Sequence, residues 1–209
     1  MPRKYNGWNS DPVELIAFDF DGTITTKDTF ALFLRYYAGT AQWLLNLILL
    51  LPGFIAYGLR LIDRNAVKRQ VVRRFFGGES QTEVKARAEQ FAREVIPGLV
   101  RPAALAEVNA KLARGEAVAL VSASINDYLD VWAKSAGILK VIATRLAVDG
   151  DVLTGALDGP NCWGEGKLAS IAAEMGSKNY IIAEAYGDSE GDKPMLIAAK
   201  VTFWQPFRV

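Results

Sequence analysis

Short apolar runs alternate with helical segments along most of this chain. Five of the runs predict strands, because each is short, rich in β-forming side chains and bounded by turn residues. They cover residues 13–18, 117–121, 139–143, 180–185 and 201–204. Helices are predicted between them, at 103–114, 126–136, 167–175 and 195–199. This alternation favours an α/β fold in which a parallel sheet carries helices on both faces.

Two segments depart from the alternation. Residues 28–96 show helical patterns without a strand, and Pro97-Gly98 ends them, which predicts a helical insertion after the first strand. A hairpin is predicted from Val148 to Leu157, because Asp149-Gly150-Asp151 lies between β-rich flanks. We interpret Asp149 and Asp151 as turn residues rather than metal ligands.

The insertion contains a long apolar stretch, residues 41–62, which has no charge before Arg60 and approaches the length of a membrane span. Pro52-Gly53 predicts a split into two helices, each too short to cross a membrane alone. Gln42 and Asn46 also weaken a spanning interpretation. Three interpretations stay open: a buried core and homodimer contact, an apolar wall for a greasy substrate, or peripheral membrane docking beside basic residues 60–74.

Composition removes several kinds of chemistry. The 209 residues include no histidine, which excludes Ser-His-Asp and Cys-His catalysis and any His-ligated metal. The single cysteine, Cys162, allows no intrachain disulfide and fits a cytoplasmic setting, and we interpret it as a packed residue without a redox role. Nothing in the net charge of +1 suggests nucleic-acid binding, and the first residues lack a signal-peptide apolar region. Carboxylates, hydroxyls, amines and an oxygen-ligated metal remain.

Polar residues follow several of the predicted strands. Asp19 and Asp21 come directly after the first strand and before the turn residue Gly22. Alternation along an extended chain would point both carboxylates the same way, and their repulsion would then require a cation or a shared proton. Ser122 and Asp188 also lie at strand ends, where parallel sheets bind ligands. We therefore expect these residues to converge on one edge of the sheet.

Four stretches resemble, in order and spacing, the motifs of the haloacid dehalogenase (HAD) superfamily. They are Asp19-Phe20-Asp21-Gly22-Thr23, Ser122 in LVSAS, Lys167 in GEGKL, and Gly187 to Asp192, GDSEGD. The insertion between the first two motifs, and residues 161–167, NCWGEGK, are similar to the phosphoserine phosphatase-like branch with its helical cap. Phe20 stands where P-type ATPase relatives have lysine. The resemblance implies a Rossmann-like three-layer core of residues 1–26 and 98–209, with a cap of residues 27–97.

The resemblance also implies a Mg²⁺-dependent phosphatase that works through an aspartyl-phosphate. Asp19 would be the nucleophile, and the Asp21 side chain would protonate the leaving group and then deprotonate water. Mg²⁺ would be bound by Asp19, the backbone carbonyl of Asp21, and Asp188, with Asp192 behind them. Ser122 and Lys167 would contact the phosphate or the nucleophile, and the backbone near Gly22 and Ala123 would contribute to substrate binding. Asp192 could instead cap the helix that contains Pro194.

Recognition of the leaving group stays open in the sequence. Asp28 stands seven residues after Asp21, where the related branch has a glutamate that binds the substrate amine; it could contact another group or cap a helix from Thr29. Enzymes of that branch also use a cap arginine for the substrate carboxylate. The comparable region here contains Lys68, Arg69, Arg73 and Arg74, for which a solvated basic helix face is the default interpretation. We expect a small phosphorylated metabolite. The alternatives are a phosphatidylglycerophosphatase-like enzyme on a membrane surface, a phosphotransferase with the same residues, and a non-catalytic binding module.

Overall fold

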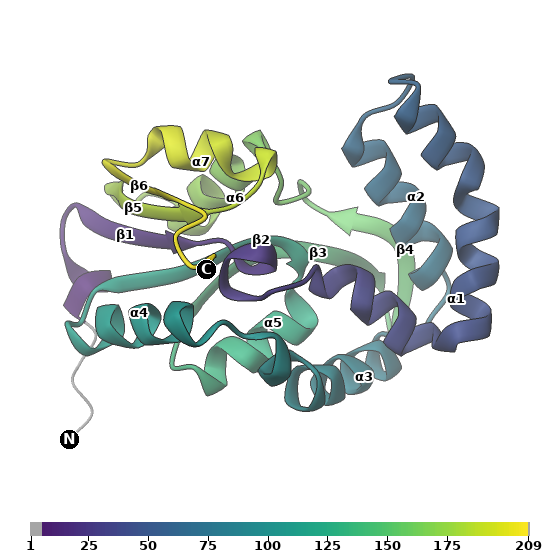
Figure 1. Ribbon diagram of the computed structural model, residues 1–209, viewed down its shortest axis with the longest axis horizontal. Helices are drawn as coiled ribbons and strands as arrows, with labels where there is room; N and C mark the ends of the chain where they lie inside the picture. The colour runs from purple at the N-terminus through teal and green to yellow at the C-terminus, as the bar shows by residue number, and fades with distance from the viewer. Residues whose placement is uncertain (1–5, 209) are drawn as a thin grey trace.

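A computed structural model describes residues 6–208, so the first five residues of the expected core and Val209 lie outside the described part. Its centre is a six-stranded sheet in the order β4-β3-β2-β1-β5-β6 (Figure 1). Neighbouring strands are parallel except β4, which runs antiparallel to β3. The strands are β1 (Val13–Phe18), β2 (Ala117–Ile125), β3 (Lys140–Asp149), β4 (Val152–Asp158), β5 (Tyr180–Gly187) and β6 (Val201–Trp204).

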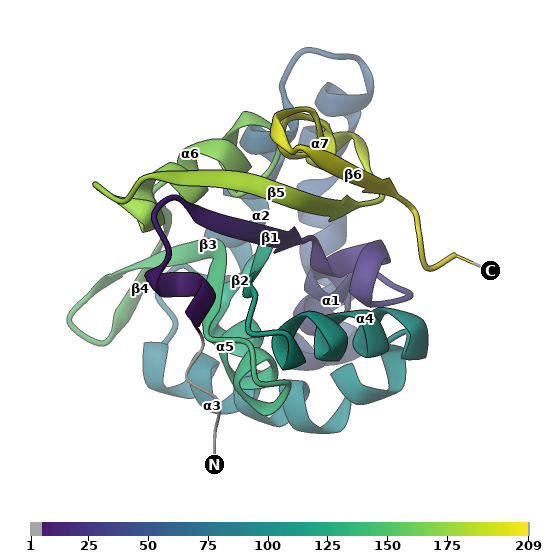
Figure 2. The ribbon, with the colours of Figure 1, turned by 90° about the vertical axis from the view of Figure 1, so that its left-hand side faces the viewer.

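The described residues also form helices, four of which cover the two faces of this sheet. They are α1 (Thr29–Gly58), α2 (Arg64–Phe76), α3 (Gln81–Glu94), α4 (Pro102–Ala113), α5 (Asn126–Ser135), α6 (Glu165–Met175) and α7 (Lys193–Ala198). Helices α6 and α7 lie on one face, and α4 and α5 lie on the other (Figures 1 and 2). The predicted three-layer α/β fold is therefore confirmed. Helices α1 to α3 lie within residues 27–97, and the division of the chain into a core and a cap stays a prediction.

Strand alternation builds the two cores. In β1, Ile16 and Phe18 pack on the side of α4 and α5, whereas Leu15 and Ala17 pack on the side of α6 and α7. Successive side chains of a strand point to opposite faces, so a central strand that is covered on both faces is apolar throughout. This explains why β1 was predicted with the bounds that the structure has.

The third predicted strand and the predicted hairpin form one continuous unit. Strand β3 extends from the predicted segment through Asp149, and β4 returns beside it. Ile142, Thr144 and Leu146 are buried at every second position, which is strand periodicity across the predicted gap. The predicted hairpin is confirmed. The predicted end of the third strand at residue 143 is wrong, because polar Thr144 and Arg145 interrupt the apolar run without interrupting the strand.

Helix α1 corrects the predicted split at Pro52-Gly53. The helix continues through Pro52, and its break lies at Gly39, where φ is +73° and ψ is 163°. This backbone conformation is accessible mainly to glycine. The helix begins as one alternative proposed, because the Asp28 carboxylate accepts a hydrogen bond from the backbone N–H of Ala31.

Candidate active site

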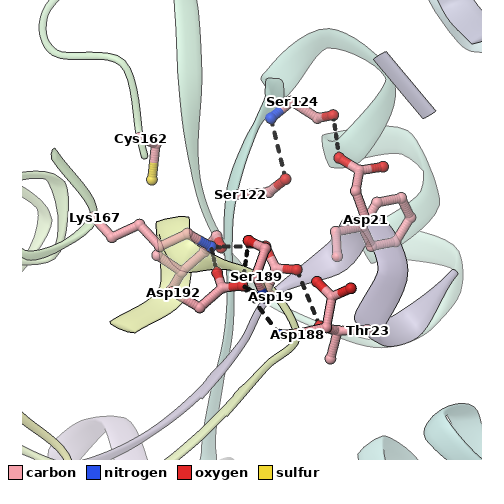
Figure 3. A network of polar contacts seen from close by, with 12 residues as sticks. Asp19, Asp21, Thr23, Ser122, Ser124, Cys162, Lys167, Asp188, Ser189 and Asp192 are labelled. Atoms are coloured by element: carbon pink, nitrogen blue, oxygen red, sulfur yellow. Dashed lines mark hydrogen bonds and ion pairs between the residues drawn. The ribbon is translucent and has the colours of Figure 1, made fainter. Parts of the chain in front are cut away.

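Strands β1 and β5 bring the first and last acidic motifs together. Their parallel register pairs Phe18 with Tyr186, so Asp19, one residue after Phe18, and Asp188, two residues after Tyr186, emerge at the same edge of the sheet. Carboxylate oxygens of Asp19, Asp188 and Asp192 all lie within 4.8 Å of one another (Figure 3). The expected convergence of Asp19 and Asp188 on one sheet edge is what the structure shows, although their positions are far apart in the sequence.

Lys167 holds this acidic cluster from the start of α6. Its buried Nζ lies 2.7 Å from Asp19 Oδ1 and 2.8 Å from Asp192 Oδ1, and it also donates to the backbone carbonyl of Val121 (Figure 3). Burial acts to lower the pKa of Lys167, but the two carboxylates outweigh this effect and raise it. The ammonium group is therefore charged at neutral pH, and it partly compensates the acidic cluster.

Asp192 supports the loop that carries Asp188. Its Oδ2 accepts hydrogen bonds from the backbone N–H groups of Asp188 and Ser189 and from Ser189 Oγ, at 3.1, 2.9 and 2.8 Å. Burial acts to raise the pKa of Asp192, but Lys167 and these donors keep it below its ordinary value. Asp192 stands at the N-cap position of the helix containing Pro194, as the alternative proposed, but its side chain makes no capping hydrogen bond to that helix.

Asp21 turns away from the acidic cluster. Its Oδ1 accepts hydrogen bonds from the backbone N–H and the hydroxyl of Thr29, at 2.7 and 2.6 Å, and its Oδ2 accepts one from Ser124 Oγ at 2.5 Å. Asp19 and Asp21 do not point the same way, because the chain leaves β1 in a tight turn instead of an extended strand. Burial and then the charge of Asp28 raise the pKa of Asp21 to about 6, against these hydrogen bonds.

The turn after Asp19 depends on Gly22. Its φ of +82° favours glycine, and a Cβ atom at this position would lie 2.2 Å from Asp188 Oδ2. A side chain here would therefore collide with the last acidic motif. Glycine allows the first loop and the Asp188 loop to approach each other.

Asp188 is the carboxylate with spare ligand capacity. Its Oδ2 pairs with Arg208 near the end of the chain, whereas its Oδ1 is buried and has no hydrogen-bond partner among the described residues. Burial, with a smaller contribution from the charge of Asp192, raises the pKa of Asp19 to about 8 although Lys167 opposes the shift. Three converging carboxylates with an unpaired buried oxygen fit Mg²⁺, which prefers oxygen ligands.

The second motif places its residues at different depths. Ser122 is fully buried, and its hydroxyl accepts a hydrogen bond from the backbone N–H of Ser124 at 3.1 Å. Ala123 and Ser124 line the cavity above the acidic cluster, whereas Ser122 is not among its lining residues. The structure therefore does not place the Ser122 hydroxyl in the cavity.

The cavity itself measures about 310 Å³ and receives side chains from the inserted helices. Asp28, Arg64 and Lys68 contribute charges, and Phe30 and Trp163 contribute aromatic walls. Of the four basic residues in the region comparable to the substrate-binding arginine of the related branch, Lys68 lines the cavity and Arg69, Arg73 and Arg74 do not. Arg74 instead donates a hydrogen bond to Asn46.

Lys68 reaches the cavity from α2, and two neighbours hold its ammonium group in place. Its Nζ donates to the backbone carbonyl of Ala123 at 3.2 Å and lies 3.0 Å from the centroid of the Phe30 ring. Burial lowers the pKa of Lys68 to about 7, although Asp28 and Asp21 oppose the shift. Its charge is therefore sensitive to pH near neutrality.

Cys162 behaves as the packed residue that was expected. It is fully buried, and its thiol donates to the carbonyl of Ile142 at 3.4 Å. Burial raises the pKa of the thiol to about 11, which leaves it protonated and unreactive at neutral pH.

Residues of this site that sequence reasoning missed include Thr29, Phe30, Ser124, Arg64, Trp163 and Arg208. Arg64 had an available signal, because it precedes Lys68 by four residues on a helix and therefore shares its face. Ser124 had a weaker one, two residues after Ser122 at a strand end. The contact between Arg208 and Asp188 joins segments whose approach no local pattern indicates.

Comparison with known proteins identifies the family. The model of the haloacid dehalogenase-like hydrolases matches residues 16–196. The chain belongs to this family. Protein CicA of Caulobacter vibrioides is 37% identical over 198 residues, which cover 93% of this chain and 86% of that protein. A probable phosphatase of Mycobacterium tuberculosis is 29% identical over 87% of this chain and 64% of its own length.

Solved structures show the same fold for this haloacid dehalogenase-like hydrolase. A protein of unknown function from Bordetella pertussis superimposes with a TM-score of 0.75 at 24% identity, covering 88% of this chain and 86% of that chain. A substrate-bound phosphoserine phosphatase gives 0.60 at 22% identity, over 91% and 85%. The predicted family is therefore confirmed, and the chain is an enzyme of this hydrolase class.

Proposed function

We propose that this haloacid dehalogenase-like hydrolase is a Mg²⁺-dependent phosphomonoesterase that forms a phosphoaspartate on Asp19. The observation that carries the proposal is the pairing of two differently held carboxylates at one cavity. Asp19 lies against Lys167 and beside Asp188, whereas Asp21 is held apart by Thr29 and Ser124. This separation allows one carboxylate to attack phosphorus and the other to exchange protons.

In the first step, a carboxylate oxygen of Asp19 attacks phosphorus and the bond from phosphorus to the ester oxygen breaks. The leaving alkoxide takes a proton from Asp21. In the second step, water attacks the phosphoaspartate, Asp21 takes the water proton, and phosphate and the Asp19 carboxylate are released. The raised pKa of Asp21, about 6, suits both directions of proton transfer near neutral pH.

The acidic cluster supplies the electrostatics of both steps. Asp19, Asp188 and the backbone carbonyl of Asp21 would hold Mg²⁺, which when bound offsets the charge of nucleophile and phosphate. Lys167 donates to Asp19 and adds positive charge within 2.7 Å of it. Asp192 orients Lys167 and the Asp188 loop.

The cavity favours a small and polar leaving group. Lys68 and Arg64 offer positive charge, Asp28 offers negative charge, and Trp163 and Phe30 offer flat apolar walls. These groups suit a phosphorylated metabolite that carries its own charges, in the manner of phosphoserine. The volume of about 310 Å³ sets the scale of such a molecule.

A panel of phosphomonoesters assayed with Mg²⁺ and with EDTA tests this proposal. We expect hydrolysis with Mg²⁺, its loss with EDTA, and a loss of at least about 10³-fold in Asp19→Asn. Asp158→Asn, in the exposed end of β4, is the matched control and should keep full activity. After acid quenching, mass spectrometry should find a phosphoryl group on the peptide that contains Asp19. Equal hydrolysis by Asp19→Asn and the parent would refute the proposal.

A lipid phosphate monoester is the second candidate substrate. The specific observation in its favour is the exposed apolar surface of α1, the helix that begins beside the cavity residues Asp28 and Phe30. Comparing kcat/KM for water-soluble esters with that for phosphatidylglycerol phosphate in mixed micelles separates the two. A higher value for the soluble esters would remove the lipid candidate.

A further inference from the structure

The outer side of α1 is an unusually exposed apolar surface. Its members share one side of the helix and are between 46% and 61% exposed: Leu44, Leu45, Ile48, Leu49, Leu51 and Ile55. At 100° per residue these positions lie on one side of the helix, and the exposed Leu59 and Leu61 follow in the turn after α1. We call these eight residues the apolar face of α1. The interpretation of the 41–62 segment as a buried core is therefore wrong for the single chain, whereas a homodimer contact stays a prediction.

The opposite side of α1 packs against α2. Asn46 and Leu50 are buried there, and Arg74 of α2 donates a hydrogen bond to Asn46 Oδ1 at 2.8 Å. Figure 1 shows α1 as the outermost element on this side of the molecule, with α2 between it and β4. Residues 42–59 contain no charged side chain. Soluble monomers rarely expose an apolar patch of this extent, so the face requires a partner.

A membrane-spanning arrangement does not fit. By length and composition α1, with 30 residues, could cross a membrane. Gly39 interrupts it, however, and α2 packs along it with five basic side chains and no acidic one. Burying α2 in hydrocarbon would be costly. Phe30 near the start of α1 and Arg64 at the start of α2 both line the cavity. The segment between them therefore has both of its ends beside the active site.

Charge decides which partner fits the apolar face. Helix α2 carries Arg64, Lys68, Arg69, Arg73 and Arg74, and Arg60 stands between Leu59 and Leu61 at the end of the face. An anionic lipid surface offers apolar chains to the face and phosphate groups to the arginines.

We propose that the apolar face of α1 docks this enzyme on an anionic phospholipid surface, with α1 lying in the plane of the membrane. The apolar side chains insert shallowly, and the exposed side chains of Arg60, Arg69 and Arg73 remain at the level of the headgroups. The cavity is lined from the same two inserted helices, so docking holds the active site close to the lipid surface. The proposal is independent of the chemistry of Asp19 and goes beyond the proposed hydrolysis.

Vesicle co-sedimentation tests the proposal. The full chain is mixed with vesicles of phosphatidylcholine alone or of phosphatidylcholine with phosphatidylglycerol. We expect binding to the anionic vesicles that weakens with added salt, and much less binding to the neutral ones. Ile48→Gln combined with Ile55→Gln should weaken binding by about tenfold or more, because two exposed apolar anchors are lost.

The matched control is Leu139→Gln combined with Ile197→Gln, two apolar residues outside α1 that are 60% and 83% exposed. It should bind vesicles like the parent. Circular dichroism and turnover of a soluble ester should be unchanged in both double variants, because neither touches the catalytic cluster.

Sedimentation velocity measures whether the chain forms a dimer, which is the competing explanation of the apolar face. A dimer that Ile48→Gln with Ile55→Gln abolishes, without vesicle binding, would assign the face to a second copy. Equal binding to both vesicle types, or to neither, would also overturn the proposal.

Discussion

At the scale of single residues, substitution of Gly22 tests whether the close approach of the loops that carry Asp19 and Asp188 shapes the metal site. Gly22→Ala would combine left-handed strain with a collision against Asp188, whereas Gly115→Ala has a similar φ of +76° and open space around it. Both should lose about 1–2 kcal/mol of unfolding free energy from the strain. Only Gly22→Ala should also lose Mg²⁺ affinity, by about tenfold or more. Urea denaturation and calorimetric Mg²⁺ titration measure the two effects. Equal Mg²⁺ affinity in both variants would show that the contact does not shape the site.

Ser124 is expected to set the pH at which Asp21 loses its proton. Its hydroxyl hydrogen-bonds the Asp21 carboxylate and lowers a pKa that burial raises to about 6. Ser124→Ala should therefore raise the pKa of Asp21 further, by about one unit. Activity that depends on ionised Asp21 would then decline at a higher pH on the acidic side of the profile of kcat against pH. Ser135→Ala, an exposed serine of α5, is the control. An unchanged acidic limb would contradict the assignment.

The sequence predicted the acidic residues of the site but not their orientation. Asp19, Asp21 and Asp188 could be found because they follow apolar strands, and strand ends converge in a parallel sheet. The partners of Asp21 could not be found. Thr29 and Ser124 meet it only because the chain turns at Gly22, and the direction of that turn depends on the neighbouring Asp188 loop.

At the scale of elements, α2 reaches the cavity through Lys68, whose charge should make substrate binding pH-dependent. Burial lowers the pKa of Lys68 to about 7, so its positive charge is present below that pH and is lost above it. For an ester with an anionic leaving group, KM should rise above pH 7, by up to about tenfold per unit. In Lys68→Arg the charge persists, so the rise should disappear while kcat changes little.

Lys85→Arg provides the matched control for this measurement, because Lys85 is an exposed residue of α3 that does not line the cavity. It should keep the rise of KM with pH that the parent shows. If the KM profiles of Lys68→Arg and the parent ran parallel, the dependence would belong to another group.

Helix α1 shows why element boundaries were harder to predict than element types. Proline was expected to break the helix at residue 52, yet Pro52 is exposed and the helix tolerates it. The break at Gly39 has no strong local signal, because Ala38-Gly39-Thr40 is compatible with a continuing helix. Packing decides: residues before Gly39 pack on the core through Phe33 and Leu34, and residues after it pack on α2 through Asn46 and Leu50.

At the scale of the whole molecule, the sheet order explains why the site requires the complete fold. Strand β1 lies between β2 and β5, so the first motif stands next to residues from the middle and the end of the chain. Asp19 and Asp188 approach each other only when these strands have paired. Ligands that need both residues therefore bind the folded chain and not the unfolded one.

Mg²⁺ should consequently raise the melting temperature. A ligand that binds only the folded state at a hundredfold excess over its Kd adds about 2.7 kcal/mol of unfolding free energy. For a chain of this length that corresponds to about 5–10 °C. Asp188→Asn should remove most of the shift, because it replaces the carboxylate whose Oδ1 is buried without a partner. Asp158→Asn, which is exposed and outside the cluster, should keep it. Differential scanning calorimetry at matched ionic strength measures the shift. If Mg²⁺ stabilised Asp188→Asn and the parent equally, Asp188 would not be a ligand of the ion, and the convergence of Asp19 and Asp188 would not explain Mg²⁺ binding.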